Sequence, residues 1–378
     1  MRLRSDYRQF PFAGLAEINW FIVLFMTLIA GIGFTMMVSA GGGHMVPWAA
    51  PQIKRFALAF ALMLIIALMP MRVLMDYAYV IYFLCLLVLV GVDITGHTGM
   101  GARRWLSLGG FNLQPSEFMK LALILVLARY FHQLHPEEIR RFTFLLPPVL
   151  LILAPAIFIL REPNLGTAMI LICTGVITCF LAGVQWRYFI GVVLAGVSAA
   201  PVAWHVMHDY QKRRVITFLD PSQDPLGAGY NILQSMIAIG SGGLFGKGYL
   251  QGSQSQLNFL PEKHTDFIFT MLGEEFGFLG CITLLVLYGL LLASGIIVAM
   301  RSRSSFGAIM ASGVVALIFT HIFINCAMVM GMLPVVGVPL PLMSYGGSIM
   351  VSTVLAVGLL LNAYVNRDEL PMRKVPKL

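Results

Sequence analysis

The stretch Gln254-Ser-Gln-Leu-Asn-Phe-Leu-Pro-Glu-Lys-His-Thr-Asp-Phe-Ile-Phe269 ends the long polar segment of this chain and opens a long apolar one. Ionisable groups near membrane depth are costly and tend to be functional, so a polar cluster at such a junction is a candidate site. The junction therefore predicts a membrane protein that does its chemistry at one end of a helix bundle. Five polar or ionisable side chains stand directly before the apolar run: Glu262, Lys263, His264, Thr265 and Asp266.

The composition is that of a chain that lies mostly in lipid. It is 58% hydrophobic and 11% charged, whereas a soluble domain carries about 25% charged residues. The formal net charge of +8 is typical of cytoplasmic Lys and Arg anchors and does not indicate nucleic-acid binding. The cysteines all lie in apolar runs without metal-ligand spacing, so no disulfide framework is expected: Cys85, Cys173, Cys179, Cys281 and Cys326.

Apolar runs long enough to cross a membrane recur along the whole chain. A helix needs about 20 apolar residues to span the hydrocarbon core. An even number of spans places both termini on one side. We expect an all-α polytopic membrane protein, 1–378 forming a single membrane domain, with a long loop at 207–266 between spans seven and eight. The ten candidate spans are 19–40, 55–71, 76–93, 115–131, 143–160, 165–183, 187–206, 267–300, 306–330 and 343–365.

The distribution of Lys and Arg favours cytoplasmic termini. With the tails 1–18 and 366–378 inside, most cations of the short connections lie on the cytoplasmic side, as the positive-inside rule requires. The first apolar run exceeds the roughly 7–15 residues of a signal peptide, so we expect an uncleaved first span. The outer loops and helix ends still hold cations that indicate an anionic group outside: Lys54, Arg55, Arg103, Arg104, Lys120 and Arg161.

The outer connection 94–114 leads into a helix with a charged first turn. Pro115 suits the start of a helix, and Glu117 and Lys120 are then neighbours on one face. This spacing fits an ion pair at the interface, and it equally fits a charged pair that faces the bundle interior.

The long loop contains two local patterns. Apolar residues recur at helical spacing from Tyr230 to Gly240, which predicts a short amphipathic helix on the outer surface or buried in the loop. The run Gly240-Ser-Gly-Gly-Leu-Phe-Gly-Lys-Gly248 fails the Walker pattern, because Ser241 replaces the first glycine and Gly248 the final Ser/Thr. Flexible turns are the favoured interpretation, and a close approach of this backbone to a pyrophosphate is the alternative.

The apolar half after the junction has three irregular features. A single helix over 267–300 would measure about 51 Å at 1.5 Å per residue, so it must extend outside the membrane, tilt or break. The proline-rich connection 331–348 cannot be helical throughout, and we expect it to fold back over the bundle. For four further polar residues the favoured role is hydrogen bonding between packed elements: Glu274, Glu275, His321 and Asn325. For Glu274 and Glu275 the alternative is a second polar layer under the site.

Several motifs give the chain a resemblance to the SEDS family (shape, elongation, division, sporulation). They extend over essentially the whole sequence, and the segment from Asp224 to Gly280 is more similar to the rod-shape branch than to the cell-division branch. The matching runs include Gln114-Pro-Ser-Glu-Phe-Met-Lys120, Asp224-Pro-Leu-Gly-Ala-Gly-Tyr-Asn-Ile-Leu-Gln-Ser235, Gly246-Lys-Gly248, His264-Thr-Asp-Phe267 and Ser344-Tyr-Gly-Gly-Ser348.

The resemblance implies a peptidoglycan polymerase that maintains rod shape during cell elongation. Its substrates would be lipid II and the growing glycan on undecaprenyl pyrophosphate, used at the outer face of the bacterial cytoplasmic (inner) membrane among membrane lipids. A class B penicillin-binding protein would cross-link the product. The essential aspartate of the family corresponds to Asp266, and its outer Glu and Lys correspond to Glu117 and Lys120.

The chemistry of that reaction agrees with the residues at the junction. The attacking GlcNAc 4-hydroxyl needs one general base, which we assign to Asp266. The leaving pyrophosphate needs a positive charge to stabilise it but no acid to protonate it. A divalent cation (Mg²⁺ or Mn²⁺) could supply part of that charge, but the sequence does not identify its ligands. Besides Glu117 and Lys120, the predicted substrate-binding residues are Arg103, Arg104, Lys247, Glu262, Lys263 and His264.

Two other classes of function are compatible with a ten-span bundle. A lipid II flippase or other transporter would need polar residues along a path to the cytoplasm, but the ionisable residues gather at the outer end. A non-catalytic scaffold for the penicillin-binding protein would need no site at all, and it would tolerate neutral substitution of Asp266 and Lys120.

Overall fold

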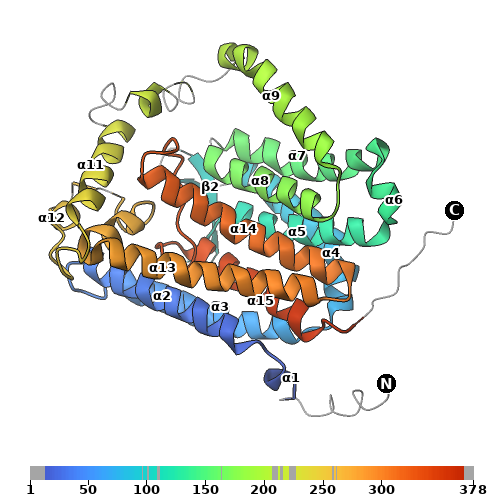
Figure 1. Cartoon of the computed structure of the whole chain (residues 1–378), viewed down its shortest axis with the longest axis horizontal. Coiled ribbons are helices and arrows are strands. Elements are labelled where there is room, and N and C mark those ends of the chain that lie inside the picture. The colour runs from blue at the N-terminus through green and yellow to red at the C-terminus, as the bar shows by residue number, and fades with distance from the viewer. Residues whose placement is uncertain are drawn as a thin grey trace.

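The protein is a bundle of long helices, described in a computed structural model for residues 13–95, 97–99, 102–108, 111–162, 164–206, 212, 216–220, 227–257, 259–260 and 262–369. The loop helices α11 and α12 lie at one end of the bundle and α6 at the other (Figure 1). The helices are α1 (Ala13–Ala16), α2 (Trp20–Ala40), α3 (Ala49–Leu68), α4 (Met71–Thr95), α5 (Pro115–Gln133), α6 (Pro136–Ile139), η2 (Phe142–Leu145), α7 (Leu146–Arg161), α8 (Leu165–Leu181), α9 (Trp186–Val206), α11 (Ala228–Ser241), α12 (Ser253–Gln256), α13 (Ile268–Arg301), α14 (Ser305–Val329) and α15 (Gly347–Val365).

The ten predicted spans are all present as helices, which confirms the fold class. Within the described part of the chain, seven helical segments are long and apolar enough to cross a membrane, and apolar parts of α8 and α9 are shorter. The remaining span, α5, carries Glu117, Lys120 and Arg129, which lowers its hydropathy. Helices α14 and α15 lie among their neighbours and are mostly buried, whereas α9 projects from the bundle with apolar side chains exposed (Figure 1).

The eighth span is broken, which is one of the three outcomes that its length allowed. Gly277 has φ 65° and ψ −160°, which is outside helical geometry, so α13 consists of two helical parts joined at a kink. A Cβ at Gly277 would lie 2.3 Å from the backbone nitrogen of Gly246. Glycine is therefore required here both for the backbone angle and for the close approach of the preceding loop.

The glycine-rich run 240–248 packs against this kink. A Cβ on Gly246 would lie 2.1 Å from the Glu275 carbonyl oxygen, and one on Gly242 would lie 2.0 Å from the Gly273 carbonyl oxygen. The backbone nitrogen of Lys247 donates to the Glu274 carbonyl at 3.0 Å. Thus the glycines permit contact between the loop and α13, which agrees with the turn interpretation.

Two connections near the Asp266 end of the bundle contain secondary structure of their own. The predicted amphipathic helix within 230–240 is confirmed as α11. The connection 94–114, in which no alternating pattern predicted a strand, contains an antiparallel sheet in the order β1-β2-β3. Its strands are β1 (His97–Gly99), β2 (Ala102–Leu108) and β3 (Phe111–Leu113).

The proline-rich connection before α15 folds back over the bundle, as predicted. Val338, Leu340 and Met343 are buried although they have no regular secondary structure. A Cβ on Gly33 in α2 would lie 2.7 Å from the Met343 Cα, and the backbone of this connection passes equally close to α8. The fold-back places residues 331–346 beside the segment that carries Asp266.

Candidate functional site

Asp266 lies just before α13, and its backbone is anchored by a residue of α14. The Asn325 side-chain nitrogen donates to the Asp266 carbonyl at 2.9 Å and to the Val338 carbonyl at 2.6 Å. Asp266 is partly exposed, and a Cβ on Gly337 would lie 3.3 Å from its Oδ2. Asn325 therefore joins the junction segment to the folded-back connection and fixes the backbone position from which the Asp266 side chain extends.

The same two segments are joined again beside Asp266. The Ser344 hydroxyl donates to the Thr265 carbonyl at 2.6 Å, and the Tyr345 backbone nitrogen donates to the His264 carbonyl at 2.8 Å. These bonds satisfy backbone groups in irregular chain, which would otherwise be costly to bury. Asp266 thus has a fixed backbone position although it lies outside a helix. We call residues 264–266, together with the folded-back connection that is bonded to them, the platform.

An aromatic group covers one side of this platform. The Trp48 ring stacks on His264 with centroids 3.9 Å apart and also meets the Tyr345 ring edge-on at 4.9 Å. The Arg55 guanidinium lies 5.2 Å from the centroid of Tyr345, within the range of a cation–π contact. The start of α3 thereby supplies an aromatic and a cationic side chain to the site.

The charges next to Asp266 are partly withdrawn from water. Burial lowers the pKa of the His264 imidazole, an effect that Glu262 opposes and Lys263 reinforces. Burial likewise lowers the pKa of the Lys263 amine, and Glu275 opposes it. The Lys263 Nζ donates to the Ser255 carbonyl at 2.6 Å, and Glu262 accepts from the Thr265 hydroxyl at 3.1 Å. Both charged residues therefore also stabilise the junction itself.

The predicted pair Glu117 and Lys120 forms a buried cluster between helices. The Lys120 Nζ lies 2.8 Å from Glu117 Oε1 and 2.9 Å from His321 Nε2, and only 1% of Lys120 is exposed. His321 Nδ1 lies 2.8 Å from the Leu317 carbonyl, so this nitrogen carries the proton and Nε2 accepts from lysine. Ser352 of α15 donates to Glu117 at 3.0 Å. The pair faces the bundle interior, which decides between the two interpretations of its spacing.

The buried cluster and Asp266 are connected through one helix. His321 and Asn325 are four residues apart on α14, so Lys120 contacts α14 one turn away from the residue that anchors Asp266. The hydrogen-bonding roles expected for His321 and Asn325 are confirmed. The structure thus brings the two predicted halves of the site together through α14.

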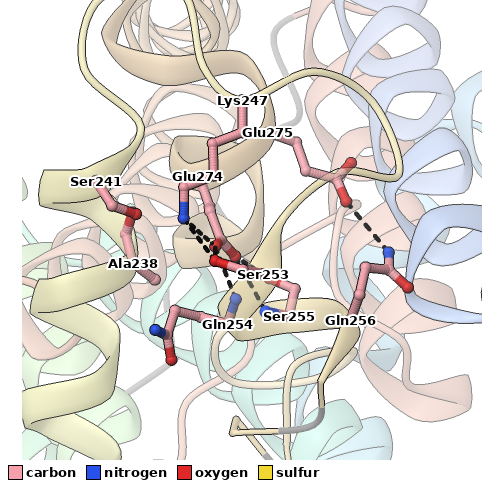
Figure 2. A network of polar contacts seen from close by, with 9 residues as sticks. All are labelled: Ala238, Ser241, Lys247, Ser253, Gln254, Ser255, Gln256, Glu274 and Glu275. Carbon is pink, nitrogen blue, oxygen red and sulfur yellow. Dashed lines mark hydrogen bonds and ion pairs between the residues drawn. The ribbon is translucent and has the colours of Figure 1, made fainter.

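Lys247 is placed in a separate polar network on the loop (Figure 2). Its Nζ lies 2.8 Å from Glu274 Oε1, and Glu274 is completely buried. Glu274 also accepts from the backbone nitrogens of Gln254 at 2.8 Å and Ser255 at 3.0 Å. Glu275 accepts from Ser39 of α2. Both glutamates therefore hold packed elements together, as expected, and Glu274 neutralises Lys247.

Two of the predicted cations cannot be placed in this site. Arg103 and Arg104 belong to β2, but their side chains lie outside the described part of the structure. The sequence also missed contributors on other elements. Trp48 carried no signal, whereas Arg55 was visible as an unexplained outer cation and Tyr345 belongs to the motif Ser344-Tyr-Gly-Gly-Ser348.

A metal site made by the protein alone is not formed by the described side chains. Among them, no three His, Cys, Asp or Glu residues come together in a way that could hold an ion. Glu117 and Glu274 are each already paired with a lysine, Lys120 and Lys247 respectively. Glu117 and Glu274 therefore serve as partners of cationic side chains and as hydrogen-bond acceptors.

Comparison with known proteins shows one family over nearly the whole chain. The model of the FtsW/RodA/SpoVE family, described as cell cycle protein, matches residues 15–369. The chain is 43% identical over 338 residues to the peptidoglycan glycosyltransferase MrdB of Escherichia coli strain K12, which covers 89% of this chain and 90% of MrdB.

Solved structures share the same fold. One is a chain from work on how a peptidoglycan synthase complex coordinates polymerization and crosslinking, with a TM-score of 0.80, 30% identity, and coverage of 93% of this chain and 99% of that chain. Another is the crystal structure of the rod shape determining protein RodA of Thermus thermophilus, with a TM-score of 0.67, 28% identity, and coverage of 93% and 98%. The similarity therefore extends to the whole helix bundle and is not confined to one motif.

Proposed function

This chain belongs to the FtsW/RodA/SpoVE family of cell cycle proteins, and we infer from that membership and from the site that it is a peptidoglycan glycosyltransferase. It polymerises lipid II by transferring the growing glycan from undecaprenyl pyrophosphate to the GlcNAc 4-hydroxyl of the next lipid II, in support of cell elongation and rod shape. The observation that carries the proposal is the partly exposed Asp266 carboxylate on a rigid platform at the end of the bundle.

The proposed reaction needs few groups from the protein. The acceptor hydroxyl gives its proton to Asp266 as its oxygen bonds to the anomeric carbon of the donor. The bond between that carbon and the pyrophosphate oxygen breaks, and its electron pair stays on the pyrophosphate. A carboxylate anchored through its backbone by Asn325 keeps its position relative to the acceptor, which favours the reactive geometry.

We place Asp266 at the extracytoplasmic face of the bacterial inner membrane, with both termini in the cytoplasm. The Lys and Arg distribution supports this orientation, and an even number of spans supports both termini on one side. The peptidoglycan synthase complex found among the structural relatives supports a class B penicillin-binding protein as partner. Lipid II reaches such a site from the outer leaflet, because its isoprenoid chain stays in the membrane.

The remaining predicted residues have graded roles in this proposal. Glu262 and His264 position the acceptor beside Asp266, and Lys263 contributes charge from a position that is largely withdrawn from water. The buried pair Glu117–Lys120 orders the bundle under the site. A requirement for Mg²⁺ or Mn²⁺ is a separate proposal, tested by assaying the purified enzyme after chelation and after each metal is returned.

The decisive experiment is polymerisation of purified lipid II by Asp266→Asn in nanodiscs, with a partner penicillin-binding protein that cannot polymerise by itself. We expect the rate to fall by roughly 10²–10⁴-fold, the usual contribution of a general base. The matched control is Glu137→Gln, which neutralises an exposed carboxylate in α6 at the opposite end of the bundle.

Each outcome of this experiment has a clear meaning. Glycan chains of normal length and rate from Asp266→Asn would refute Asp266 as the base. If the wild-type protein moved labelled lipid II across liposomes in a dye-quenching assay without polymerising it, the proposal would give way to a transporter. If neither activity depended on Asp266 or Lys120, a scaffold would be the better explanation.

A further inference from the structure

The cations near the site differ in whether their charge is already neutralised. Lys120 is paired with Glu117, and Lys247 is paired with Glu274. A cation that already faces a carboxylate has less charge to offer a new anion. The pyrophosphate of the proposed reaction therefore calls for a cation that no carboxylate neutralises in the described structure.

Arg55 meets that requirement. No ion pair is present for Arg55 among the described residues, and its Nη1 atom is buried without a hydrogen-bond partner in that part of the chain. A buried donor without an acceptor is unfavourable, and more so when the group is charged. An arginine with an unused buried donor at a partly exposed position suggests that a ligand supplies the acceptor.

The surroundings of Arg55 fix it in place without neutralising it. One face of the guanidinium lies over the Tyr345 ring, and a Cβ on Gly347 would lie only 3.3 Å from the Arg55 Nε. The absence of a side chain at Gly347 lets the guanidinium cross the first turn of α15. Gln52, one turn earlier on α3, donates to the Ser344 carbonyl at 3.1 Å and so ties α3 to the same turn.

These contacts place Arg55 on the platform that carries Asp266. Ser344 and Tyr345 are hydrogen-bonded to Thr265 and His264, the residues directly before Asp266. The guanidinium is a rigid fork of donors that matches phosphate oxygens in a bidentate way and always carries its charge. The start of α15, where Gly347 is the first residue, adds a positive dipole end on the same side.

We propose that Arg55 is the residue that binds the lipid-linked pyrophosphate during glycosyl transfer. This inference rests on the proposed function. When the bond to the anomeric carbon breaks, negative charge grows on the leaving pyrophosphate, and the Arg55 fork stabilises it. Arg55 offers only hydrogen-bond donors, so the acceptor proton remains on Asp266.

The test compares Arg55→Met and Arg55→Lys with Lys54→Met, which removes the adjacent, exposed cation of the same helix. Polymerisation of lipid II is measured in nanodiscs, together with inhibition by undecaprenyl pyrophosphate and by undecaprenyl phosphate. We expect Arg55→Met to weaken inhibition by the pyrophosphate about 10- to 100-fold, as loss of a charge-assisted contact implies, and inhibition by the monophosphate less. Arg55→Lys should recover part of the loss, because it keeps the charge but not the fork.

Binding is measured separately from turnover, so that the inference and the proposed function can fail independently. In the Asp266→Asn background, undecaprenyl pyrophosphate should raise the melting temperature, and adding Arg55→Met should remove most of that rise. A wild-type protein that binds the pyrophosphate through Arg55 but does not polymerise lipid II would contradict the proposed function alone. Equal inhibition and equal melting shifts for Arg55→Met and Lys54→Met would overturn the inference.

The phosphate could also belong to an ordinary anionic phospholipid. The binding measurement is therefore repeated in nanodiscs of phosphatidylcholine alone and of phosphatidylcholine with phosphatidylglycerol. An effect of Arg55→Met that persists in phosphatidylcholine supports the pyrophosphate. An effect that appears only with phosphatidylglycerol, without a change in inhibition by undecaprenyl pyrophosphate, would assign Arg55 to a phospholipid headgroup and overturn the proposal.

Discussion

Replacing Glu274 by glutamine should release the loop that packs against the kink of α13. Glu274 is completely buried and accepts on both carboxylate oxygens. Its Oε1 receives the Lys247 Nζ and the Gln254 backbone nitrogen, each at 2.8 Å. Its Oε2 receives the Ser255 backbone nitrogen at 3.0 Å and the Ser255 hydroxyl at 2.7 Å. Each of these neighbours is a donor, so the site is built for a carboxylate.

The magnitude follows from this geometry. A glutamine keeps one oxygen, which can serve the two Ser255 donors, but its amide nitrogen then faces the donors of Lys247 and Gln254. Two charge-assisted bonds at about 1.5–3 kcal/mol each are lost, and removal of one partner of a buried pair costs about 3–5 kcal/mol. Since 27% of the Lys247 side chain is exposed, water can replace part of the lost interaction of its amine. We therefore expect Glu274→Gln to destabilise the loop by about 3 kcal/mol.

Amide hydrogen exchange measures this loss of local stability, because two of the lost or weakened hydrogen bonds involve backbone N–H groups. A destabilisation of about 3 kcal/mol should speed exchange of Gln254 and Ser255 about a hundredfold through easier local opening. The matched control is Gln254→Ala, since the Gln254 side chain points away from Glu274 in Figure 2 and only its backbone takes part. Exchange within twofold of wild type in Glu274→Gln would refute the reasoning.

Two further predictions concern the kink and the junction. Gly277→Ala should lower the melting temperature, because it adds a Cβ 2.3 Å from a backbone nitrogen at a residue with positive φ. The control Gly289→Ala in the same helix meets nothing within 4 Å and should be neutral or slightly stabilising, so equal melting temperatures of the two variants would contradict this prediction. Burial lowers the pKa of His264, so the unfolded state binds the extra proton first and stability should fall as pH drops below about 6.5. Melting curves from pH 8 to pH 5 should show a weaker acid loss in His264→Phe than in wild type and in the exposed-site control His44→Phe, and an unchanged pH dependence in His264→Phe would contradict the assignment.

The sequence predicted the features that depend on length and local pattern. A 34-residue apolar helix is longer than the membrane is thick, so the sequence predicted that it extends outside, tilts or breaks, and the structure shows a break at Gly277. Helical spacing predicted α11, and prolines predicted the irregular connection that folds back onto α2. Each of these follows from the bilayer dimensions or from backbone sterics, which act on a segment wherever it lies in the fold.

Features that depend on distant partners were not predictable in this way. The strand β2 pairs through short segments of β1 and β3, whose register no periodicity in the sequence specifies. The charge of Lys247 looked available until the fold placed Glu274 beside it. Arg55 was visible as one of several outer cations, but only the packing against Tyr345 shows that it is fixed in place while its buried nitrogen has no partner among the described residues.

The organisation of α14 explains why the two parts of the site belong together. His321 accepts from Lys120 of α5, and one turn further Asn325 holds the backbone of Asp266. A shift of α14 along its axis therefore cannot move the buried pair without also moving the proposed base. Substitutions that disturb Lys120 should for that reason alter catalysis through the position of Asp266, although Lys120 itself is too buried to touch substrate in this conformation. In the proposed mechanism Lys120 then acts by positioning, and the proposed pyrophosphate ligand is Arg55, a cation that is held in place without a carboxylate to neutralise it in the described structure.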